Sequence, residues 1–461
     1  MKSPLVTIYI TNYNYAHYIE KAIKSVIEQS FNDYEVLIID DGSTDNSHEI
    51  IERYSNKPNI KIIYQKNKGL VVTNNIALRL SQGKYIMRLD ADDYLDVNAL
   101  KIMVSEMEKD DSLGLVFPNY FIVDQDENIL NFRKRIASDE NKVKDNPAHG
   151  ACTLIRKKFL ESIGGYDESY SCQDGYYLWV NFFTKFSVKN IETPLFYYRR
   201  HNSNLTNDSE KILTTRSNII SKFVKDNHGK INKAIAIIPV RGPNYNINSI
   251  ALQKLDNNKT ALDYKIQSAL KSKLVEKIVI TTPDQEIVDY VQKKYFDEVI
   301  VIKRHANLAR FNSGLVDTVN DVFEKSPNLK RFSVFLTLSI RYPLLKSIYI
   351  DNAIKSMNLF ETDCVVSVRV ENSKFFKSSK NGLRPILDQD KFTKLEREDL
   401  YKYSGGLIVT KKDFFIRHQQ FLGGNNGHVI IDNESSFKLE DESSKLYFKF
   451  IINNIKSKEC K

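Results

Sequence analysis

Three apolar runs in the N-terminal part of the chain each end abruptly in polar residues, and this repeated pattern limits what the chain can fold into. The runs cover residues 6–10, 35–39 and 85–89. The run at residues 35–39 is of the continuous kind that is typical of a strand buried on both faces of a parallel sheet. After the first run, apolar residues recur at helical spacing over residues 18–27. The alternation of strands and helices predicts an α/β fold with a doubly wound sheet.

Polar clusters stand at the points where these three strands should end. They cover residues 11–14, 40–45 and 90–93. In open α/β sheets, ligands bind in the crevice beyond the carboxyl ends of the strands, so we expect the clusters to converge on one site. A divalent cation neutralises a diphosphate well, and Mg²⁺ or Mn²⁺ prefers carboxylate oxygens. Asp92 and Asp93 are therefore the expected metal ligands, although an isolated Asp-x-Asp triplet is more often a surface turn.

The length of the chain predicts two domains. Its 461 residues exceed what one hydrophobic core usually organises. A polar, glycine-bearing stretch precedes a new apolar run at Ala234, where a second series of strands and helices begins. We therefore expect a first domain over residues 1–225, a linker over 226–232 and a second domain over 233–461. Both are expected to be three-layer α/β/α domains of a nucleotide-binding type.

The composition of the chain limits the cellular location and the binding partners that we expect. The formal net charge of +9 comes from lysines scattered along the chain, which is typical of solvated surface. No aromatic-plus-basic sheet motif or recognition helix is evident, so nucleic acid is not an expected partner. No stretch has the length of a membrane span and the 4 cysteines lack metal-type spacing, which together favour a cytoplasmic protein. Peripheral attachment to the inner membrane face stays open.

Taken together, the motifs of the first half resemble the family-2 inverting glycosyltransferases, which have the GT-A fold. The matching segments are residues 6–14, 29–31, 39–45, 67–69, 83–86 and 89–93. The nucleotide-sugar-binding residues that the resemblance implies are Thr11, Tyr13, Asp40, Asp41 and Asp92. Asp92, together with Asp93, is also implied to hold the metal and the diphosphate. Thr73-Asn74-Asn75 stands where the family has Ala-Arg-Asn, so the sequence leaves the donor open.

The resemblance also implies a catalytic base. Residues 173–179 resemble the family's Glu-Asp-x-x-Leu-Trp segment and place Asp174 at the position of the base. An inverting transfer needs a carboxylate that takes the proton of the acceptor hydroxyl. Taken alone, the segment would favour a helix N-cap for Asp174. The flanking match favours the base.

Further candidates for the site come from two other segments. Residues 197–204 resemble the Tyr-Arg-x-His segment that closes over the diphosphate in related enzymes. This makes Arg199, Arg200 and His201 candidate phosphate contacts. His149 is a candidate on the acceptor side, with a structural histidine as an equal alternative.

The second half resembles the cytidylyltransferases that activate sialic-acid-like nine-carbon sugars. The matching segments are residues 237–242, 262–270, 278–282, 284–287, 343–345, 350–354 and 405–409. Pro243-Asn244-Tyr245 stands where the family has Gly-Ser-Lys, so the lysine for the triphosphate is absent. We therefore expect this domain to be inactive or altered, with Arg241 as its phosphate-binding candidate. A scaffold for a homo-oligomer is an equal alternative.

The expected function follows from the first half. It is that of a metal-dependent inverting glycosyltransferase, which moves a sugar from a nucleotide-diphosphate donor to a hydroxyl of a glycan or glycolipid acceptor in the synthesis of cell-surface polysaccharide. Two alternatives stay open. One is a bifunctional enzyme that also activates an acidic nine-carbon sugar with CTP, and the other is a non-catalytic nucleotide-binding assembly protein.

Overall fold

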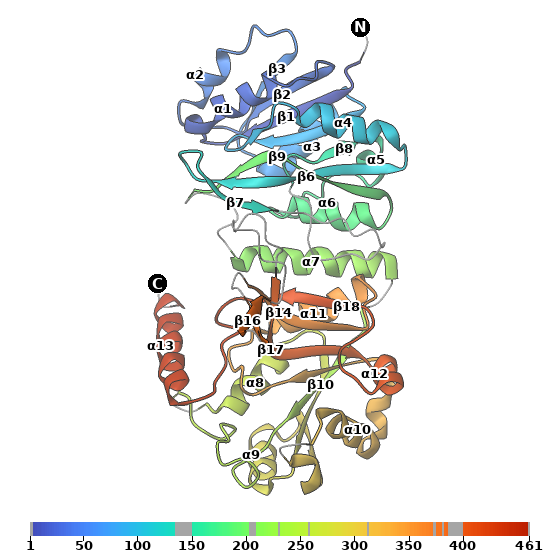
Figure 1. The fold of residues 1–461 in the computed structure, drawn as a ribbon, viewed down its shortest axis with the longest axis vertical. Helices are drawn as coiled ribbons and strands as arrows, with labels where there is room; N and C mark the ends of the chain where they lie inside the picture. Colours follow the sequence, from blue (N-terminus) through green and yellow to red (C-terminus); the bar gives the residue numbers. More distant parts are fainter. Residues whose placement is uncertain are drawn as a thin grey trace. The chain divides into compact units, whose positions relative to one another are not determined.

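The chain divides into two compact units, each with its own mixed sheet (Figure 1). The computed structural model describes residues 3–133, 150–201, 209–228, 231–256, 259–310, 313–371, 375–379, 382–385 and 400–459. The first unit comprises Met1–Ile219 with Lys374–Glu398, and the second comprises Ile220–Ser373 with Asp399–Lys461. Both sheets are flanked by helices, so the predicted α/β fold class is confirmed for the two halves of the chain.

The first unit is built on a 9-stranded sheet with the order β3-β2-β1-β4-β8-β6-β9-β5, in which β7 pairs with β6. Its strands are β1 (Val6–Asn12), β2 (Tyr34–Asp40), β3 (Ile60–Tyr64), β4 (Tyr85–Asp90), β5 (Tyr94–Leu95), β6 (Leu113–Val123), β7 (Ile129–Arg133), β8 (Leu154–Arg156) and β9 (Ser187–Arg199). Its helices are α1 (Ala16–Ile27), α2 (Ser47–Glu52), α3 (Leu70–Leu80), α4 (Ala99–Lys109), α5 (Lys157–Ser162) and α6 (Asp174–Phe183). The helix α7 (Ser209–His228) begins in this unit and extends into the stretch that was predicted as a linker.

Alternating side chains of the strands divide the core of the first unit into two clusters. One cluster joins Ile8 of β1 to residues of α1, α2 and α4. The other joins the neighbouring Tyr9 to residues of α3, α5 and α6. Because successive side chains of a strand point to opposite faces, the sheet lies between two layers of helices. The continuous apolar runs of the sequence therefore correspond to strands that are covered on both faces.

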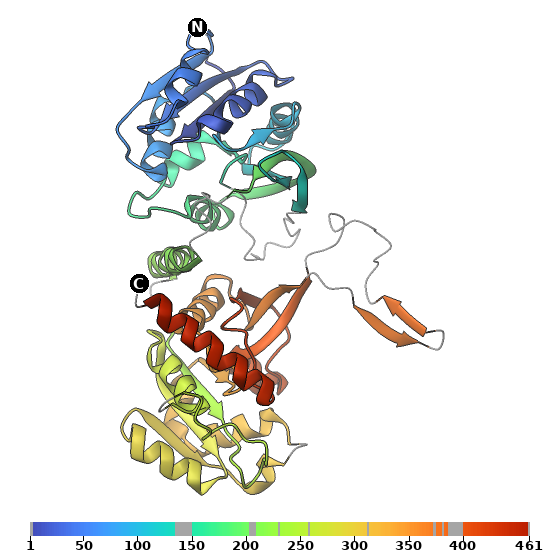
Figure 2. The same cartoon turned by 90° about the vertical axis from the view of Figure 1, so that its left-hand side faces the viewer.

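The second unit is built on a 7-stranded sheet with the order β12-β11-β10-β13-β17-β14-β18. Its strands are β10 (Ala234–Pro239), β11 (Val275–Thr282), β12 (Val299–Lys303), β13 (Val334–Leu338), β14 (Cys364–Glu371), β17 (Leu400–Lys411) and β18 (Asn426–Ile430). Its helices are α8 (Ala261–Leu270), α9 (Gln285–Tyr295), α10 (Leu315–Lys325), α11 (Ser347–Leu359), α12 (Lys412–His418) and α13 (Glu442–Glu459), with short 3-10 helices at Ala306–Ala309 and Pro327–Arg331. Helix α13 is the dark red helix near the C-terminus in Figure 2. It packs through Phe448, whose ring centroid lies 5.4 Å from that of Tyr264 of α8. Strands β15 (Phe376–Ser379) and β16 (Gly382–Pro385), which are assigned to the first unit, form a separate hairpin.

The two sheets share one connectivity. In each, the first strand lies between the second and the fourth, the third forms the outer edge, and all four are parallel. An antiparallel strand then follows beside the fourth strand, β8 in the first unit and β17 in the second. The next two strands, β6 with β9 and β14 with β18, are parallel to each other. Each unit therefore gathers the carboxyl ends of four strands at one edge.

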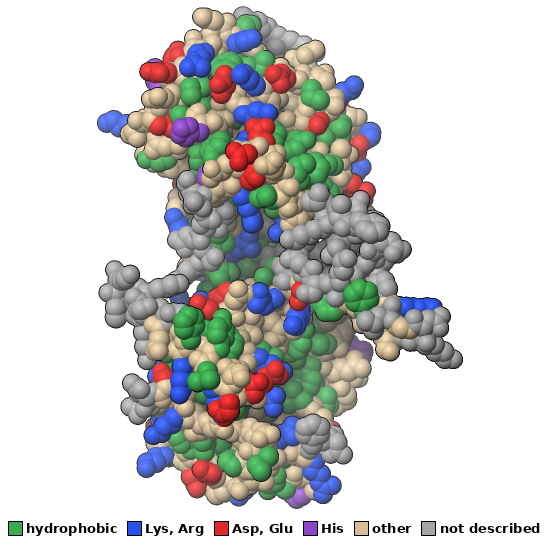
Figure 3. Space-filling model, turned by 60° about the vertical axis from the view of Figure 1, so that its left-hand side comes forward, with side chains coloured by type: hydrophobic (Ala, Val, Ile, Leu, Met, Phe, Trp, Pro, Cys, Tyr) green, Lys and Arg blue, Asp and Glu red, His purple; other side chains and the backbone are tan. Residues whose placement is uncertain are grey.

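Two further observations concern the molecule's surroundings. Within the described ranges, no helix combines the length and the apolarity that a membrane crossing requires. On the face shown in Figure 3, basic and acidic side chains are interspersed. This distribution of charges agrees with the expectation that the lysines are spread over solvated surface.

Candidate functional site

The register of the first sheet brings the three predicted polar clusters to one edge. Asn12 at the end of β1 lies opposite Asp40 at the end of β2. On the other side of β1, Thr11 lies opposite Asp90 at the end of β4. The Thr11 hydroxyl also donates a hydrogen bond of 3.1 Å to Asp90. The parallel pairing of these strands is what gathers polar residues that lie far apart in the sequence.

The two aspartates after β2 hold the loops around this edge. Asp40 accepts hydrogen bonds from the Asn12 amide and the Ser43 hydroxyl, both at 2.6 Å. Asp41 accepts hydrogen bonds of 2.8 Å from the backbone N–H groups of Lys68 and Gly69. Both carboxylates are buried. They therefore shape the wall of the site, and the Asp41 carboxylate is already bound to the loop before α3.

The acidic cluster at the end of β4 consists of Asp90, Asp92 and Asp93. The pKa values of Asp90 and Asp93 are raised. The carboxyl of Asp90 keeps part of its surface exposed, yet desolvation at the strand ends raises its pKa to about 6, a shift that the Arg88 guanidinium opposes. Burial and the neighbouring Asp92 raise the pKa of Asp93 well above its usual range. Crowded carboxyl groups with raised pKa values are typical of functional sites that bind or react with a ligand.

One oxygen of this cluster has no protein partner. Asp93 is buried, and its Oδ1 accepts a hydrogen bond of 2.8 Å from the backbone N–H of Arg199. Its Oδ2 is buried without a partner among the described residues. A buried carboxylate oxygen without a donor is costly unless a ligand supplies one, so this atom suits a bound cation.

A divalent cation would need ligands in addition to the protein. Across the described ranges, no group of three or more His, Cys, Asp or Glu side chains is arranged to hold a metal, and Cys152, Cys172 and Cys364 are free thiols. Mg²⁺ is commonly held by one or two carboxylates together with substrate phosphates. The aspartates after β4 fit a cation of this kind, which would be completed by a diphosphate.

Asp174 lies at the same edge, joined to it by Arg88. The Arg88 side chain of β4 forms an ion pair with Asp174 Oδ2 and a second ion pair, of 2.9 Å, with Asp90. The Asn74 amide of α3 donates a hydrogen bond of 3.1 Å to the same Oδ2 of Asp174. No contact of Asp174 Oδ1 is found among the described residues. One oxygen is therefore anchored, and the other is available to a ligand.

Arg88 and Asn74 were not predicted as site residues, and the sequence carries a signal for each. Arg88 is the one charged residue within an otherwise apolar run, and it lies two residues before Asp90, so both side chains share a face of β4. Asn74 stands at the position where the resembling family has arginine. Gly150 adds a third element, because a Cβ there would lie 2.7 Å from Arg88 and 3.3 Å from Asp174.

The remaining predicted residues lie in different settings. His201 lies against Asp92, with 2.9 Å between Nε2 and Oδ2, and its ring stacks on Tyr18. Arg199 is buried, and it donates hydrogen bonds to the carbonyl oxygens of Asp92, Asp124 and Gln125. These contacts hold the chain around the acidic cluster and argue against the predicted contact of Arg199 with phosphate.

Within the described part of the chain, no contact assigns a role to the three other predicted residues, Tyr13, Arg200 and His149. Tyr13 is 47% exposed at the rim of the site, and Arg200 is exposed. His149 lies outside the described residues.

The predicted residue of the second unit lies at the equivalent sheet edge. Arg241 follows β10, and its guanidinium lies 3.4 Å from the carbonyl oxygens of Ala309 and Arg310. The buried Arg304 binds the carbonyl oxygens of Val240 and Thr281. Burial and the charge of Arg241 lower the pKa of Arg304 to about 10. Two guanidinium groups thus lie close together at this edge.

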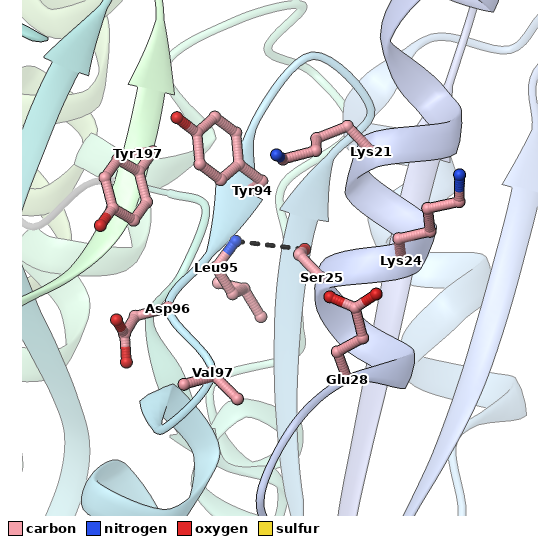
Figure 4. A pocket seen from close by; sticks show the side chains of 9 residues that line it. All are labelled: Lys21, Lys24, Ser25, Glu28, Tyr94, Leu95, Asp96, Val97 and Tyr197. Atoms are coloured by element: carbon pink, nitrogen blue, oxygen red, sulfur yellow. Dashed lines mark hydrogen bonds between the residues drawn. The ribbon is translucent and has the colours of Figure 1, made fainter. Parts of the chain in front are cut away.

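A cavity (Figure 4) opens on the first unit beside β5, whose first residue, Tyr94, directly follows Asp93. It has a volume of about 380 Å³ and lies between α1 and the segments of β5 and β9. Its lining residues are Lys21, Lys24, Ser25, Glu28, Tyr94, Leu95, Asp96, Val97 and Tyr197. The Tyr94 ring is stacked on Tyr197 at 4.5 Å, and Lys21 lies 5.0 Å from the Tyr94 centroid. The aromatic faces are therefore already covered, and the cavity contains none of the predicted site residues.

Comparison with known proteins identifies the part of the chain that carries the acidic cluster. Residues 7–164 match the family model described as Glycosyl transferase family 2. The N-terminal part contains a family 2 glycosyltransferase domain. The match includes Asp40, Asp41 and the cluster after β4. Asp174 lies beyond it.

Two relatives and one solved structure are similar to parts of this chain. A chondroitin synthase of Escherichia coli is 42% identical over 128 residues, which are 28% of this chain and 19% of that protein. The glucosyltransferase WfgD of Escherichia coli, named as a UDP-Glc:alpha-D-GlcNAc-diphosphoundecaprenol beta-1,3-glucosyltransferase, is 25% identical over 228 residues, which are 49% of this chain and 89% of that protein. The structure of S. aureus TarS 1-349 with UDP-GlcNAc aligns with 15% identity and a TM-score of 0.42, over 87% of this chain and 99% of that one. The chain therefore spans only about a fifth of the length of the chondroitin synthase that it matches.

Proposed function

We propose that the protein is a metal-dependent inverting glycosyltransferase of the GT-A fold, which transfers a sugar from a nucleotide-diphosphate donor to a hydroxyl of a glycan or lipid-linked acceptor in polysaccharide synthesis. The observation that carries the proposal is the link from Asp174 through Arg88 to Asp90, within a sheet edge that also holds Asp92 and Asp93. The family 2 match of the N-terminal part supports it. In an inverting transfer the base lies on the face of the anomeric carbon opposite the leaving diphosphate, and this edge carries candidate residues for both roles.

In this proposal Asp174 is the general base. Its Oδ2 is held by Arg88 and Asn74, while Oδ1 faces no described partner. Oδ1 would accept the proton of the acceptor hydroxyl as that oxygen attacks the anomeric carbon. The bond between the anomeric carbon and the diphosphate oxygen breaks in the same step, with the electron pair leaving on the diphosphate.

Asp92 and Asp93 would hold Mg²⁺ or Mn²⁺ together with the diphosphate. The cation neutralises the charge that develops on the leaving diphosphate. The buried Oδ2 of Asp93, which has no partner among the described residues, supports this role. His201 would fix the orientation of Asp92 through their contact of 2.9 Å.

The nucleoside of the donor would bind against the wall that the ends of β1 and β2 form. Thr11 and the exposed Tyr13 would contact the base and ribose, while Asp40 and Asp41 hold the surrounding loops in place. The relative named for UDP-glucose supports a UDP-sugar as the first donor to test, and its undecaprenol-linked acceptor supports a lipid-linked glycan as the first acceptor.

The test is a screen of UDP-, GDP-, dTDP- and CMP-sugars for metal-dependent hydrolysis and for transfer to lipid-linked glycans. Asp174→Asn is the decisive variant, because the amide cannot accept the proton yet keeps the shape of the side chain. We expect it to bind the donor normally and to lose about 10²- to 10⁴-fold in transfer rate. Transfer at the parental rate would exclude Asp174 as the base.

A second candidate function concerns the second unit. Its sheet edge places Arg241 beside the buried Arg304, which supports the binding of an anionic group such as a nucleotide phosphate. A cytidylyltransferase-like domain that binds a nucleotide without activating a sugar agrees with the absent lysine of the sequence motif. The test is the release of pyrophosphate from CTP in the presence of an acidic nine-carbon sugar, together with the stabilisation of the protein by CTP alone. CTP that stabilises the parent but not Arg241→Met would support binding, and pyrophosphate release would support the bifunctional alternative.

A further inference from the structure

The residue that precedes Asp174 adopts an unusual backbone conformation. Gln173 has φ 63° and ψ 31°, in the left-handed region that residues other than glycine rarely occupy. Asp174 is the first residue of α6, so the backbone at Gln173 sets the direction in which the helix begins. Strained conformations of this kind persist only where the surroundings hold them, and they occur often at functional sites.

Helix α7 supplies the groups that hold Gln173. The Arg216 Nε donates a hydrogen bond of 2.6 Å to the Gln173 side-chain oxygen. The same guanidinium lies 4.9 Å from the centroid of the Tyr176 ring, one turn into α6. The preceding residue of α7, Thr215, accepts a hydrogen bond of 3.3 Å from the Cys172 thiol. Two consecutive residues of α7 thus contact Gln173 and the residues on either side of it. All of these residues belong to the first unit.

The orientation of the Asp174 carboxylate depends on these contacts of α7, because its own side-chain partners bind only one of its two oxygens. Arg88 and Asn74 both bind Oδ2, which fixes one oxygen but leaves the carboxylate free to turn about that anchor. The direction of Oδ1 is therefore set by the position of the Asp174 backbone. That position is set in turn by Gln173.

We propose that Arg216 and Gln173 are positioning residues, which act through the strained backbone before α6 to aim Asp174 Oδ1 at the acceptor hydroxyl. The inference rests on the proposed function of Asp174 as the base. Neither residue needs to touch the substrate. Their contribution lies in the alignment of the base, to which reaction rates are sensitive over distances as small as about 1 Å.

The experiment compares steady-state transfer by the full chain and by Arg216→Met, Gln173→Ala, Gln173→Glu and the double variant Arg216→Met/Gln173→Ala. We expect each of the first two to lower kcat by about 10- to 100-fold with donor binding and the donor KM unchanged, because alignment of the base is lost while the donor site is intact. Gln173→Glu keeps an acceptor oxygen for Arg216 and should retain most of the parental kcat. The double variant should be no slower than the slower single variant, because both changes break one contact.

Lys225→Met is the matched control, since Lys225 is an exposed cation on the same helix. A parental kcat for Arg216→Met would overturn the proposal. So would a loss of kcat that is matched by an equal loss of donor affinity and of thermal stability, which would indicate a general role of α7 in folding. If Asp174→Asn transfers normally, the proposed function itself fails. If Asp174→Asn is inactive while Arg216→Met is normal, only the positioning role fails.

Discussion

The two units of this protein have the same sheet connectivity but carry different chemical groups at the same edge. The aspartates after the second strand play a similar part in both. In the first unit Asp40, at the end of β2, accepts a hydrogen bond from the Asn12 amide at the end of β1. In the second unit Asp284, after β11, accepts from the backbone N–H of Gly242 and from the Asn244 amide after β10. In each case a buried carboxylate near the end of the second strand binds an amide at or just after the end of the first strand.

The difference lies after the fourth strand. In the first unit β4 ends in Asp90 and is followed by Asp92 and Asp93, whereas β13 of the second unit is followed by Ser339-Ile340-Arg341-Tyr342, without a carboxylate. The shared connectivity therefore provides an edge where a ligand can bind. The residues that follow the fourth strand decide whether that edge can hold a cation and a diphosphate.

The largest expected effect comes from removing an aspartate that only the first unit has. Asp92→Ala should lower sugar transfer by about 10³-fold or more and remove its dependence on added Mg²⁺ or Mn²⁺, since a charge-stabilising group of this kind contributes several kcal/mol. Asp284→Ala, its matched control at the edge of the second unit, should leave transfer near the parental rate. The measurement is initial transfer rate against metal concentration for both variants. Equal losses in the two would show that transfer depends on the sheet edges of both units.

The second prediction concerns Arg88, the buried cation shared by Asp90 and Asp174. Arg88→Met leaves two carboxylates without their counter-charge, and breaking a buried ion pair in this way costs about 3–5 kcal/mol. We expect a lower unfolding temperature together with a loss of transfer. Arg79→Met, on the exposed side of α3, is the control and should change neither. An unfolding temperature equal to that of the parent would mean that the ion pairs contribute little.

The strands and their polar ends were predictable because apolar runs that stop abruptly are a local signal. The convergence of residues 11–14, 40–45 and 90–93 followed from that signal and from the parallel pairing of strands. The roles of Arg88 and Arg199 did not follow. One is buried between carboxylates and the other among carbonyl oxygens, and both environments are created by segments distant in sequence. A basic side chain in a motif shows that a charge is present, but only tertiary contacts show whether it faces a ligand.

The same limit applies to the second unit. Its strand and helix series was readable from residue 234 onward, whereas the pairing of β17 in antiparallel fashion between β13 and β14 depends on long-range contacts. The closeness of Arg241 and Arg304 also arises there, because the ends of β10 and β12 are brought together by β11. Sequence patterns therefore predicted the elements and their polar ends, and tertiary packing supplied the partners.

The third prediction concerns the stability of the second unit and how it changes with pH. Lys265 of α8 is fully buried, and burial lowers the pKa of its amine to about 7. Above pH 7 the unfolded chain binds a proton that the folded chain does not, so folding becomes more favourable as the pH rises toward about 10. Lys265→Met removes this penalty and should stabilise the second unit at pH 7 by about 1–3 kcal/mol, after the loss of the hydrogen bond from the amine to the Tyr342 carbonyl.

The measurement for Lys265 is the unfolding temperature of the parent and of Lys265→Met between pH 6 and pH 10. We expect the difference between them to be largest at the acid end and to shrink as the pH rises, because the amine of the unfolded parent then loses its proton as well. Lys355→Met offers a comparison, since burial also lowers the pKa of Lys355 while Asp351 opposes the shift. A difference for Lys265→Met that does not change with pH would mean that the buried amine keeps its proton.

The smallest expected effect tests how the helices of the two units begin. Thr260 caps α8 in the second unit, where its hydroxyl accepts from the Asp263 backbone N–H and the Asp263 carboxylate accepts from the Thr260 N–H. Asn46 precedes α2 in the first unit without a side-chain cap hydrogen bond. Thr260→Ala should therefore lower the free energy of unfolding by about 1 kcal/mol, and Asn46→Ala should lower it by a few tenths at most. Urea unfolding of both variants beside the parent decides the matter: equal midpoints for the two would mean that the capping box of α8 adds nothing to the second unit, whose helix would then be held by its packing alone.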